Sequence, residues 1–171
     1  MPTYTKIASS TVGAGGASSV TFSSIPATYT DLVIKISARQ NVAYANAYLQ
    51  FNGSSGANYS YRRLRSDGSG TSSATASSQT SADIFASVNR SSSTANTFSN
   101  AEIYIPNYTS ANFKSFSIDA VNENNAIAAD AALGADLWSQ TAAITSVTLL
   151  ADSGAAYTQY STFTLYGISN A

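Results

Sequence analysis

The segment DLVIKISA (residues 31–38) has an apolar side chain at every second position from Leu32 to Ala38. Successive side chains of a strand point to opposite faces, so this period of two predicts a strand with one buried face. A helix would need apolar residues at spacings of three and four instead. The expected inner face holds Leu32, Ile34, Ile36 and Ala38, and the outer face holds Val33, Lys35 and Ser37.

The same alternation recurs along the chain and predicts about ten strands. The clearest further segments are 46–51, 101–105, 115–120, 146–151 and 162–166, and weaker ones are 4–10, 18–22, 58–65 and 82–88. The expected inward residues outside 31–38 are Leu49, Phe51, Ile103, Ile105, Phe116, Ile118, Val147, Leu149, Phe163 and Leu165.

Three segments lack a clear alternation. The alanine-rich segment 125–138 is compatible with a strand or a helix. Residues 66–81 and 91–96 are almost purely Ser, Thr, Ala, Gly and Asn, which predicts solvent-exposed loops. So many strands in a single domain of 171 residues predict an all-β, antiparallel β-sandwich of jelly-roll type, with two packed sheets of four or five strands.

Composition narrows the chemistry that the chain can perform. It has no Cys and no His, which excludes disulfides, thiolate nucleophiles, imidazole bases and the usual zinc sites. The net charge is −1 and only 10% of residues are charged, so we expect no binding of nucleic acid or membrane surfaces. Residues 1–6 resemble no signal peptide, and no run of apolar residues is long enough to span a membrane.

The local excess of positive charge at Arg62, Arg63 and Arg65 is the one candidate binding surface. On a strand Arg63 and Arg65 share a face with Tyr59 and Tyr61, and these side chains could hold a sugar, a phosphate or a carboxylate of a partner. The alternative is a solvated strand face whose arginines pair with nearby acids.

No catalytic, cofactor-binding or metal-ligating residues are predicted. The acidic residues are scattered, although two carboxylates could still converge in space. The segment Asp67-Gly68-Ser69-Gly70 lacks the alternating oxygen ligands of a calcium loop and predicts a turn. Trp138 is expected in the core rather than against a sugar ring, because large aromatic side chains dominate burial.

Several stretches together resemble a family of small virion proteins of tailed phages that infect aquatic bacteria. They are VTFSSIPATYTDLVI (20–34), LQFNGSSGANYS (49–60), Leu137-Trp138 with the strand that follows, and STFTLYGI (161–168). The resemblance implies a structural component of the particle, made in the host cytoplasm and located in the virion, with no enzymatic activity and no cofactor.

Three hypotheses follow. The first is a capsid decoration (cement) protein, a homotrimer that binds the major capsid protein or other virion proteins and stabilises the shell. The second is a tail fibre or appendage module that binds host surface glycans. The third is a small hydrolase, which the lack of histidine and of paired acidic motifs disfavours. The first strand begins near Met1 with no shaft-forming segment before it, and this favours decoration.

Overall fold

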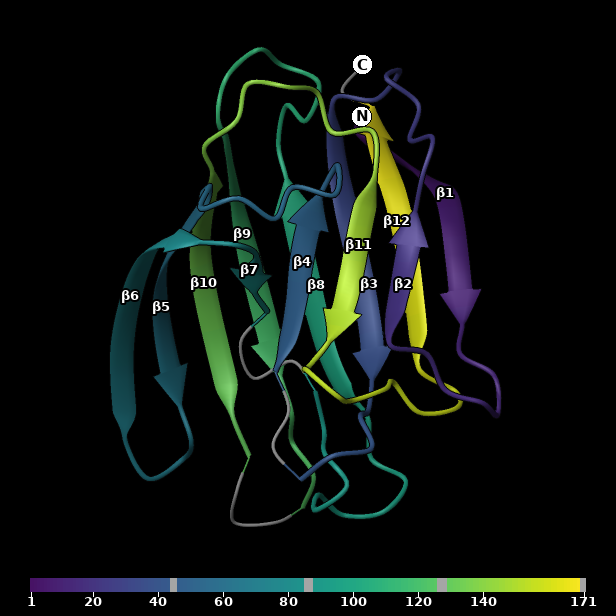
Figure 1. Ribbon diagram of the computed structural model, residues 1–171, viewed down its shortest axis with the longest axis vertical. Coiled ribbons are helices and arrows are strands. Elements are labelled where there is room, and N and C mark those ends of the chain that lie inside the picture. The colour runs from purple at the N-terminus through teal and green to yellow at the C-terminus, as the bar shows by residue number, and fades with distance from the viewer. Residues whose placement is uncertain (44–45, 85–87, 126–128, 170–171) are drawn as a thin grey trace.

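The chain forms two antiparallel β-sheets packed face to face, in a computed structural model that describes residues 1–43, 46–84, 88–125 and 129–169. In Figure 1 the smaller sheet lies in front of the larger one. The larger sheet holds, in spatial order, β1 (Thr3–Thr11), β12 (Thr162–Ser169), β3 (Asp31–Ala38), β8 (Ser99–Ile105), β9 (Lys114–Val121), β10 (Ala131–Trp138), β5 (Tyr59–Ser66) and β6 (Thr71–Gln79). The smaller sheet holds β2 (Ser19–Phe22), β11 (Val147–Ala151), β4 (Ala47–Phe51) and β7 (Ala82–Asp83). The all-β sandwich is therefore confirmed.

The core lies between the two sheets and follows the alternation of the sequence. Every residue that was expected to face inward is at most 5% exposed. An aromatic cluster fills one end of this core: the ring of Phe51 on β4 lies 5.2 Å from Phe116 and 5.4 Å from Trp138. Tyr59 stacks on Trp138, and its hydroxyl oxygen accepts a hydrogen bond from the backbone N–H of Phe51. Trp138 is thus a core residue, as predicted.

The strands divide eight and four between the sheets, rather than four or five each as expected. The jelly-roll assignment stays a prediction. The segment 125–138 resolves as strand β10 from residue 131 onward, while 126–128 lie outside the described residues. Of the weak candidate 82–88 only Ala82–Asp83 is a strand, and 85–87 are likewise outside the described part. None of the described residues belongs to a helix that could cross a membrane.

The prediction of a loop over residues 66–81 is wrong, because Thr71–Gln79 forms strand β6 at the edge of the larger sheet. Backbone pairing with β5 holds β6 in place, with Arg62 opposite Thr75 and Ser66 opposite Thr71. Both faces of β6 are largely exposed, so its side chains need not be apolar. Only residues 67–70 form the tight turn, where the Asp67 carboxylate accepts hydrogen bonds from the backbone N–H groups of Ser69 and Gly70.

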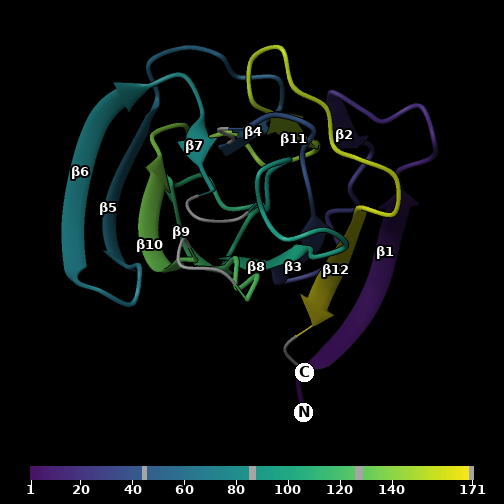
Figure 2. The ribbon, with the colours of Figure 1, turned by 90° about the horizontal axis from the view of Figure 1, so that it is seen from below.

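The larger sheet bends beyond β10. Figure 2 shows β5 and β6 standing beside the smaller sheet rather than beneath it. The short strand β7 lies against both β5 and β10 at this bend. Side chains on the inner side of β5 and β10 therefore meet those of β7 and of the neighbouring loops.

Candidate functional site

The residues of the predicted binding surface lie on both faces of strand β5. Tyr59 is 2% exposed and belongs to the core, so it takes no part in an exposed surface. Arg63 and Arg65 lie on the inner side and are half-buried, whereas Arg62 is exposed on the outer side, where it donates a hydrogen bond to the Thr75 hydroxyl. Tyr61 shares the inner side with Arg63, whose guanidinium lies 5.7 Å from the Tyr61 ring centre. The five residues thus do not form one continuous surface.

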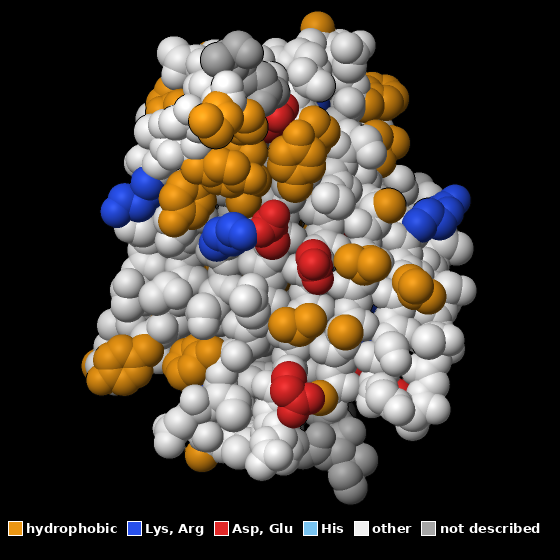
Figure 3. Space-filling model, turned by 180° about the vertical axis from the view of Figure 1, so that it is seen from behind, with side chains coloured by type: hydrophobic (Ala, Val, Ile, Leu, Met, Phe, Trp, Pro, Cys, Tyr) orange, Lys and Arg blue, Asp and Glu red, His pale blue; other side chains and the backbone are white. Residues whose placement is uncertain are grey.

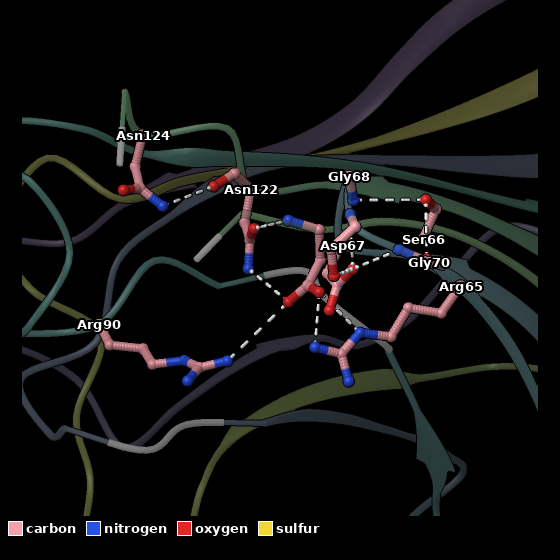
Figure 4. Close-up of polar contacts among 10 residues, drawn as sticks. Arg65, Ser66, Asp67, Gly68, Gly70, Arg90, Asn122 and Asn124 are labelled. Atoms are coloured by element: carbon pink, nitrogen blue, oxygen red, sulfur yellow. Dashed lines mark hydrogen bonds and ion pairs between the residues drawn. The ribbon is translucent and has the colours of Figure 1, made fainter. Parts of the chain in front are cut away.

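Asp130, just before β10, binds Arg65 on the inner side of the bend. Its Oδ1 accepts from Arg65 Nε at 2.7 Å and lies 2.5 Å from Arg65 Nη2. Its Oδ2 accepts from Asn122 Nδ2 at 3.4 Å and lies 4.0 Å from Arg90 Nη2. In Figure 4 the labelled Arg65 and Arg90 approach from opposite sides. The carboxylate is 5% exposed, so it has been desolvated and depends on these donors.

Asp83 on β7 faces Arg63 across the same space. The distance from Arg63 Nη1 to Asp83 Oδ2 is 3.9 Å, which is longer than a hydrogen bond. Asp83 Oδ1 is buried without a hydrogen-bond partner among the described residues. Burial raises the pKa of Asp83 to about 6; Arg63 opposes that shift and Asp152 adds to it. Arg65 is therefore hydrogen-bonded to Asp130, whereas Arg63 and Asp83 form a longer ion pair.

A third acid, Asp136 on β10, is buried at 2% exposure next to this group. Both of its carboxylate oxygens lack hydrogen-bond partners within the described part of the chain. Burial raises the pKa of Asp136 to about 8, and the charge of Asp83 raises it further. Asp136 is consequently protonated at neutral pH.

Arg63, Arg65, Asp83 and Asp130 line a polar cavity of about 130 Å³, here called the arginine cavity. Three of the five arginines of the chain reach it, two from β5 and one from the loop after β7. Its lining consists of Asn46, Arg63, Arg65, Asp83, Val88, Arg90, Asn122 and Asp130. Within the described residues no three His, Cys, Asp or Glu side chains gather as a metal site would require.

The outer face of the larger sheet, turned away from the smaller one, carries a second feature, a tyrosine cluster of Tyr4, Tyr104 and Tyr166. Tyr4 is 57% exposed, and its ring meets Tyr166 edge-on at 6.4 Å. Val33 was expected to point outward and does, yet it is fully buried, because Tyr166 and Tyr104 flank it in the cross-strand row. Figure 3 shows apolar side chains gathered toward one end of this face.

Strands β10 and β5, on the side of the outer face away from β1 and β12, carry a leucine pair. Leu64 on β5 lies directly opposite Leu133 on β10, and both are more than half exposed. Together with Ala131 and Asp119 they border a shallow hollow of about 220 Å³. Around them the outer face presents mostly short hydroxyl side chains, such as Ser115 and Ser117 of β9.

Sequence reasoning missed Arg90, Asp83, Asp130 and Asp136 as members of one site. Only the burial of Asp136 could have been predicted from the sequence. In a strand, a residue two positions before Trp138 lies on the same face, and Trp138 was expected in the core. The others come from loops and from a two-residue strand, where periodicity carries no information.

Comparisons of the chain with protein-family models, with curated proteins and with solved structures gave no match.

Proposed function

We propose that this protein is a structural component of a tailed-phage particle, a capsid decoration protein that binds the major capsid protein. The proposed docking surface is the outer face of the larger sheet. The resemblance to phage virion proteins suggests that the protein belongs to a phage particle. The exposed apolar side chains of the outer face suggest that it binds another protein through this face.

The observation that carries the proposal is an uncovered sheet face with exposed aromatic and aliphatic side chains, on which Arg62 and Asp119 are further charged residues. Tyrosine is enriched in protein interfaces, and charged residues are depleted at their centres. Near the middle of the face, Lys35 and Glu102 neutralise each other as an ion pair. The tyrosine cluster lies on β1, β12 and β8 and the leucine pair on β10 and β5, and each could anchor a partner.

The area of this face is adequate for a specific contact. The six strands from β1 to β10 cover roughly 25 Å by 25 Å, given usual strand spacing and rise. That is about 600 Å², close to the about 800 Å² per partner that a standard interface buries. Each copy then contributes a modest binding free energy, and many copies together stabilise the shell.

The test is binding of purified protein to capsids from which it has been removed. Wild-type protein should restore full occupancy, and stripped capsids should rupture at a lower temperature than decorated ones. Tyr4→Asp and Leu133→Asp should each lower occupancy, because each places an unpaired charge in the interface. Both side chains are more than half exposed in the monomer, so neither change disturbs the core.

Ser19→Asp is the matched control, because Ser19 is an exposed residue of β2 in the other sheet. It adds the same charge away from the proposed surface and should leave occupancy unchanged. Failure of wild-type protein to bind capsids would overturn the proposal. Loss of host adsorption with normal capsid strength would instead place the protein in the tail.

A further inference from the structure

We propose that the free edge of β6 is a docking site for an extended segment of another protein, which pairs with β6 as a further antiparallel strand. This edge belongs to the isolated chain, so the proposal does not depend on capsid decoration.

The four edges of the two sheets differ in how they are protected. An edge strand exposes unpaired backbone N–H and C=O groups to other strands, and proteins block such an edge by shortness, by a bulge or by charges such as Lys. In the smaller sheet, the edge strands β2 and β7 have only four and two residues. In the larger sheet, β1 carries Lys6 and a bulge between Lys6 and Ala8.

Strand β6 has none of these protections. It is nine residues long and contains no Pro and no charged residue. Its pairing with β5 is regular from Thr71 to Ala76, and the register shift lies beyond, opposite residues 59–61. Figure 1 shows β6 at the margin of the molecule, and among the described residues no further strand pairs with it. A long, regular and uncharged edge is the type of surface to which an extended peptide adds as a strand.

The turn before β6 shows which of its backbone groups are free. The N–H of Asp67 donates to the carbonyl oxygen of Gly70, so this pair at the turn is hydrogen-bonded. Hydrogen-bonded and non-hydrogen-bonded pairs alternate along an antiparallel ladder. The ladder continues from this turn without a register shift, so the N–H and C=O groups of Thr71, Ser73 and Thr75 point away from β5. These three residues offer the donors and acceptors that an added strand needs.

Arg62 indicates one residue of the partner segment. It lies opposite Thr75 on the exposed face of β5 and donates a hydrogen bond to the Thr75 hydroxyl group. None of the described acidic residues forms an ion pair with it. Opposite charges in one cross-strand row attract each other. An acidic residue added opposite Thr75 would therefore pair with Arg62 across the short Thr75 side chain.

The leucine pair indicates a second residue of the partner segment. Ser73 lies opposite Leu64, which itself lies opposite Leu133. Because Ser73 is short, an apolar residue added opposite it would extend the apolar surface of the two leucines. In an antiparallel strand this residue follows the acidic one by two positions. The expected partner is thus an extended segment with one acidic residue, an apolar residue two positions later, and otherwise uncharged side chains.

A second copy of this chain fits the edge less well. Its own β6 has no acidic residue to pair with Arg62. Two copies that meet only along β6 would share a contact about 30 Å long and about 10 Å deep, which buries about 600 Å² in total. A stable dimer needs about 1,200 Å² or more. A segment of a larger partner does not have to supply the whole interface through this edge.

The experiment is hydrogen exchange of the folded chain, measured by NMR with and without a peptide. The probe is a short, capped, threonine-rich peptide that carries one Glu and, two positions later, one Leu. Without peptide, the amides of Thr71, Ser73 and Thr75 should exchange quickly, whereas those of Ser72 and Ala74 are protected by β5. About 1 mM peptide should slow the first three at least about fivefold and leave the other two unchanged. Binding to a sheet face would not produce this alternation.

Ser73→Pro should weaken peptide binding at least about tenfold, because it removes an outward N–H at a position where an edge strand tolerates proline. Ser73→Thr is the matched control, since it keeps that N–H, and it should change the affinity by less than about twofold. A second test leaves the protein unchanged. The same peptide with N-methyl groups on its Glu and Leu keeps both side chains but loses the N–H groups that face β6, and it should not bind.

Arg62→Gln should weaken binding of the Glu peptide about threefold, as expected for an exposed ion pair. It should leave a peptide with Gln in place of Glu unaffected. Equal binding of the N-methylated peptide, or no saturation by about 5 mM peptide, would overturn the proposal. Slow exchange of Thr71, Ser73 and Thr75 in the chain without peptide would also overturn it, and a mass of two chains would then identify a second copy as the occupant.

Discussion

At the scale of single residues, the buried environment of Asp136 favours the protonated, neutral form of its carboxyl group. The folded protein raises its pKa to about 8, above the 3.8 of an ordinary Asp. The folded state therefore binds the proton more tightly than the unfolded state does. The contribution of Asp136 to stability should be highest below about pH 4, fall as pH rises through this window, and level off above about pH 8. Asp83 acts in the same direction up to about pH 6.

Replacing Asp136 with Asn removes the titrating group and keeps the shape. We expect the variant to be more stable than the wild type by a few kcal/mol at about pH 9, and to differ little at about pH 4. Urea unfolding at both pH values measures the difference. Asp119→Asn on the exposed face of β9 should behave like the wild type. An unchanged pH dependence in Asp136→Asn would show that this carboxyl is ionised in the folded state.

Lys114 is a buried cation whose ammonium group is hydrogen-bonded within the fold. It is 1% exposed, and its Nζ donates to the carbonyl oxygens of Ser110, Asn112 and Ala142 at 2.6–2.9 Å. The same ammonium lies 5.9 Å from the ring of Trp138. It thereby ties the loop before β9 to the loop after β10.

Lys114→Met should lower the free energy of unfolding by about 3 kcal/mol, because it leaves several buried carbonyl groups without a donor. Lys35→Met is the control, since Lys35 is half exposed and its ion pair with Glu102 lies at the surface. That change should cost less than about 1 kcal/mol. Equal costs for the two variants, measured by denaturant unfolding, would contradict a structural role for Lys114.

At the scale of elements, Arg39 organises the loop between β7 and β8. Its guanidinium donates to the backbone carbonyls of Ser93, Thr94 and Thr97 at 2.9–3.0 Å. The loop is rich in Ser and Thr and contributes few apolar side chains, so these hydrogen bonds are a main constraint on it. One side chain that follows β3 therefore fixes a segment more than fifty residues away.

Arg39→Gln should raise the hydrogen-exchange rate of residues 91–97 and their sensitivity to proteases, while the sheets stay protected. Arg62→Gln, which removes an arginine that donates hydrogen bonds within the β5–β6 hairpin, should leave this loop unchanged. Exchange measured by mass spectrometry distinguishes the two. If the loop keeps its protection in Arg39→Gln, backbone contacts alone hold it.

At the scale of the whole molecule, the sparse charge and the exposed tyrosines of the outer face suit a surface that becomes covered. We expect a homo-oligomer, a trimer, with each contact burying more than about 1,000 Å² in total. Light scattering at micromolar concentration should give three times the mass of the chain. A mass equal to one chain would contradict the trimer in solution.

The sequence by itself determined the fold class, the core and most strands. Side chains of a strand alternate strictly, so the pattern of residues 31–38 specified which of them face inward before any partner strand was known. The pattern could not identify β6, because both faces of this strand are largely exposed and its sequence therefore has no alternation of apolar and polar residues. It also placed Arg62, Arg63 and Arg65 in one cluster, although alternation puts Arg62 on the opposite face.

Only the tertiary structure decided the division of eight and four strands and the bend that creates the arginine cavity. Arg65, Arg90 and Asp130 come from three segments far apart in the chain. Which acid meets which arginine depends on how β7 and the loops pack against β5 and β10, and such long-range packing leaves no local signal. The burial of Asp136 likewise follows from the sheet that covers it, since the environment of a carboxyl, and not its residue type, sets its pKa.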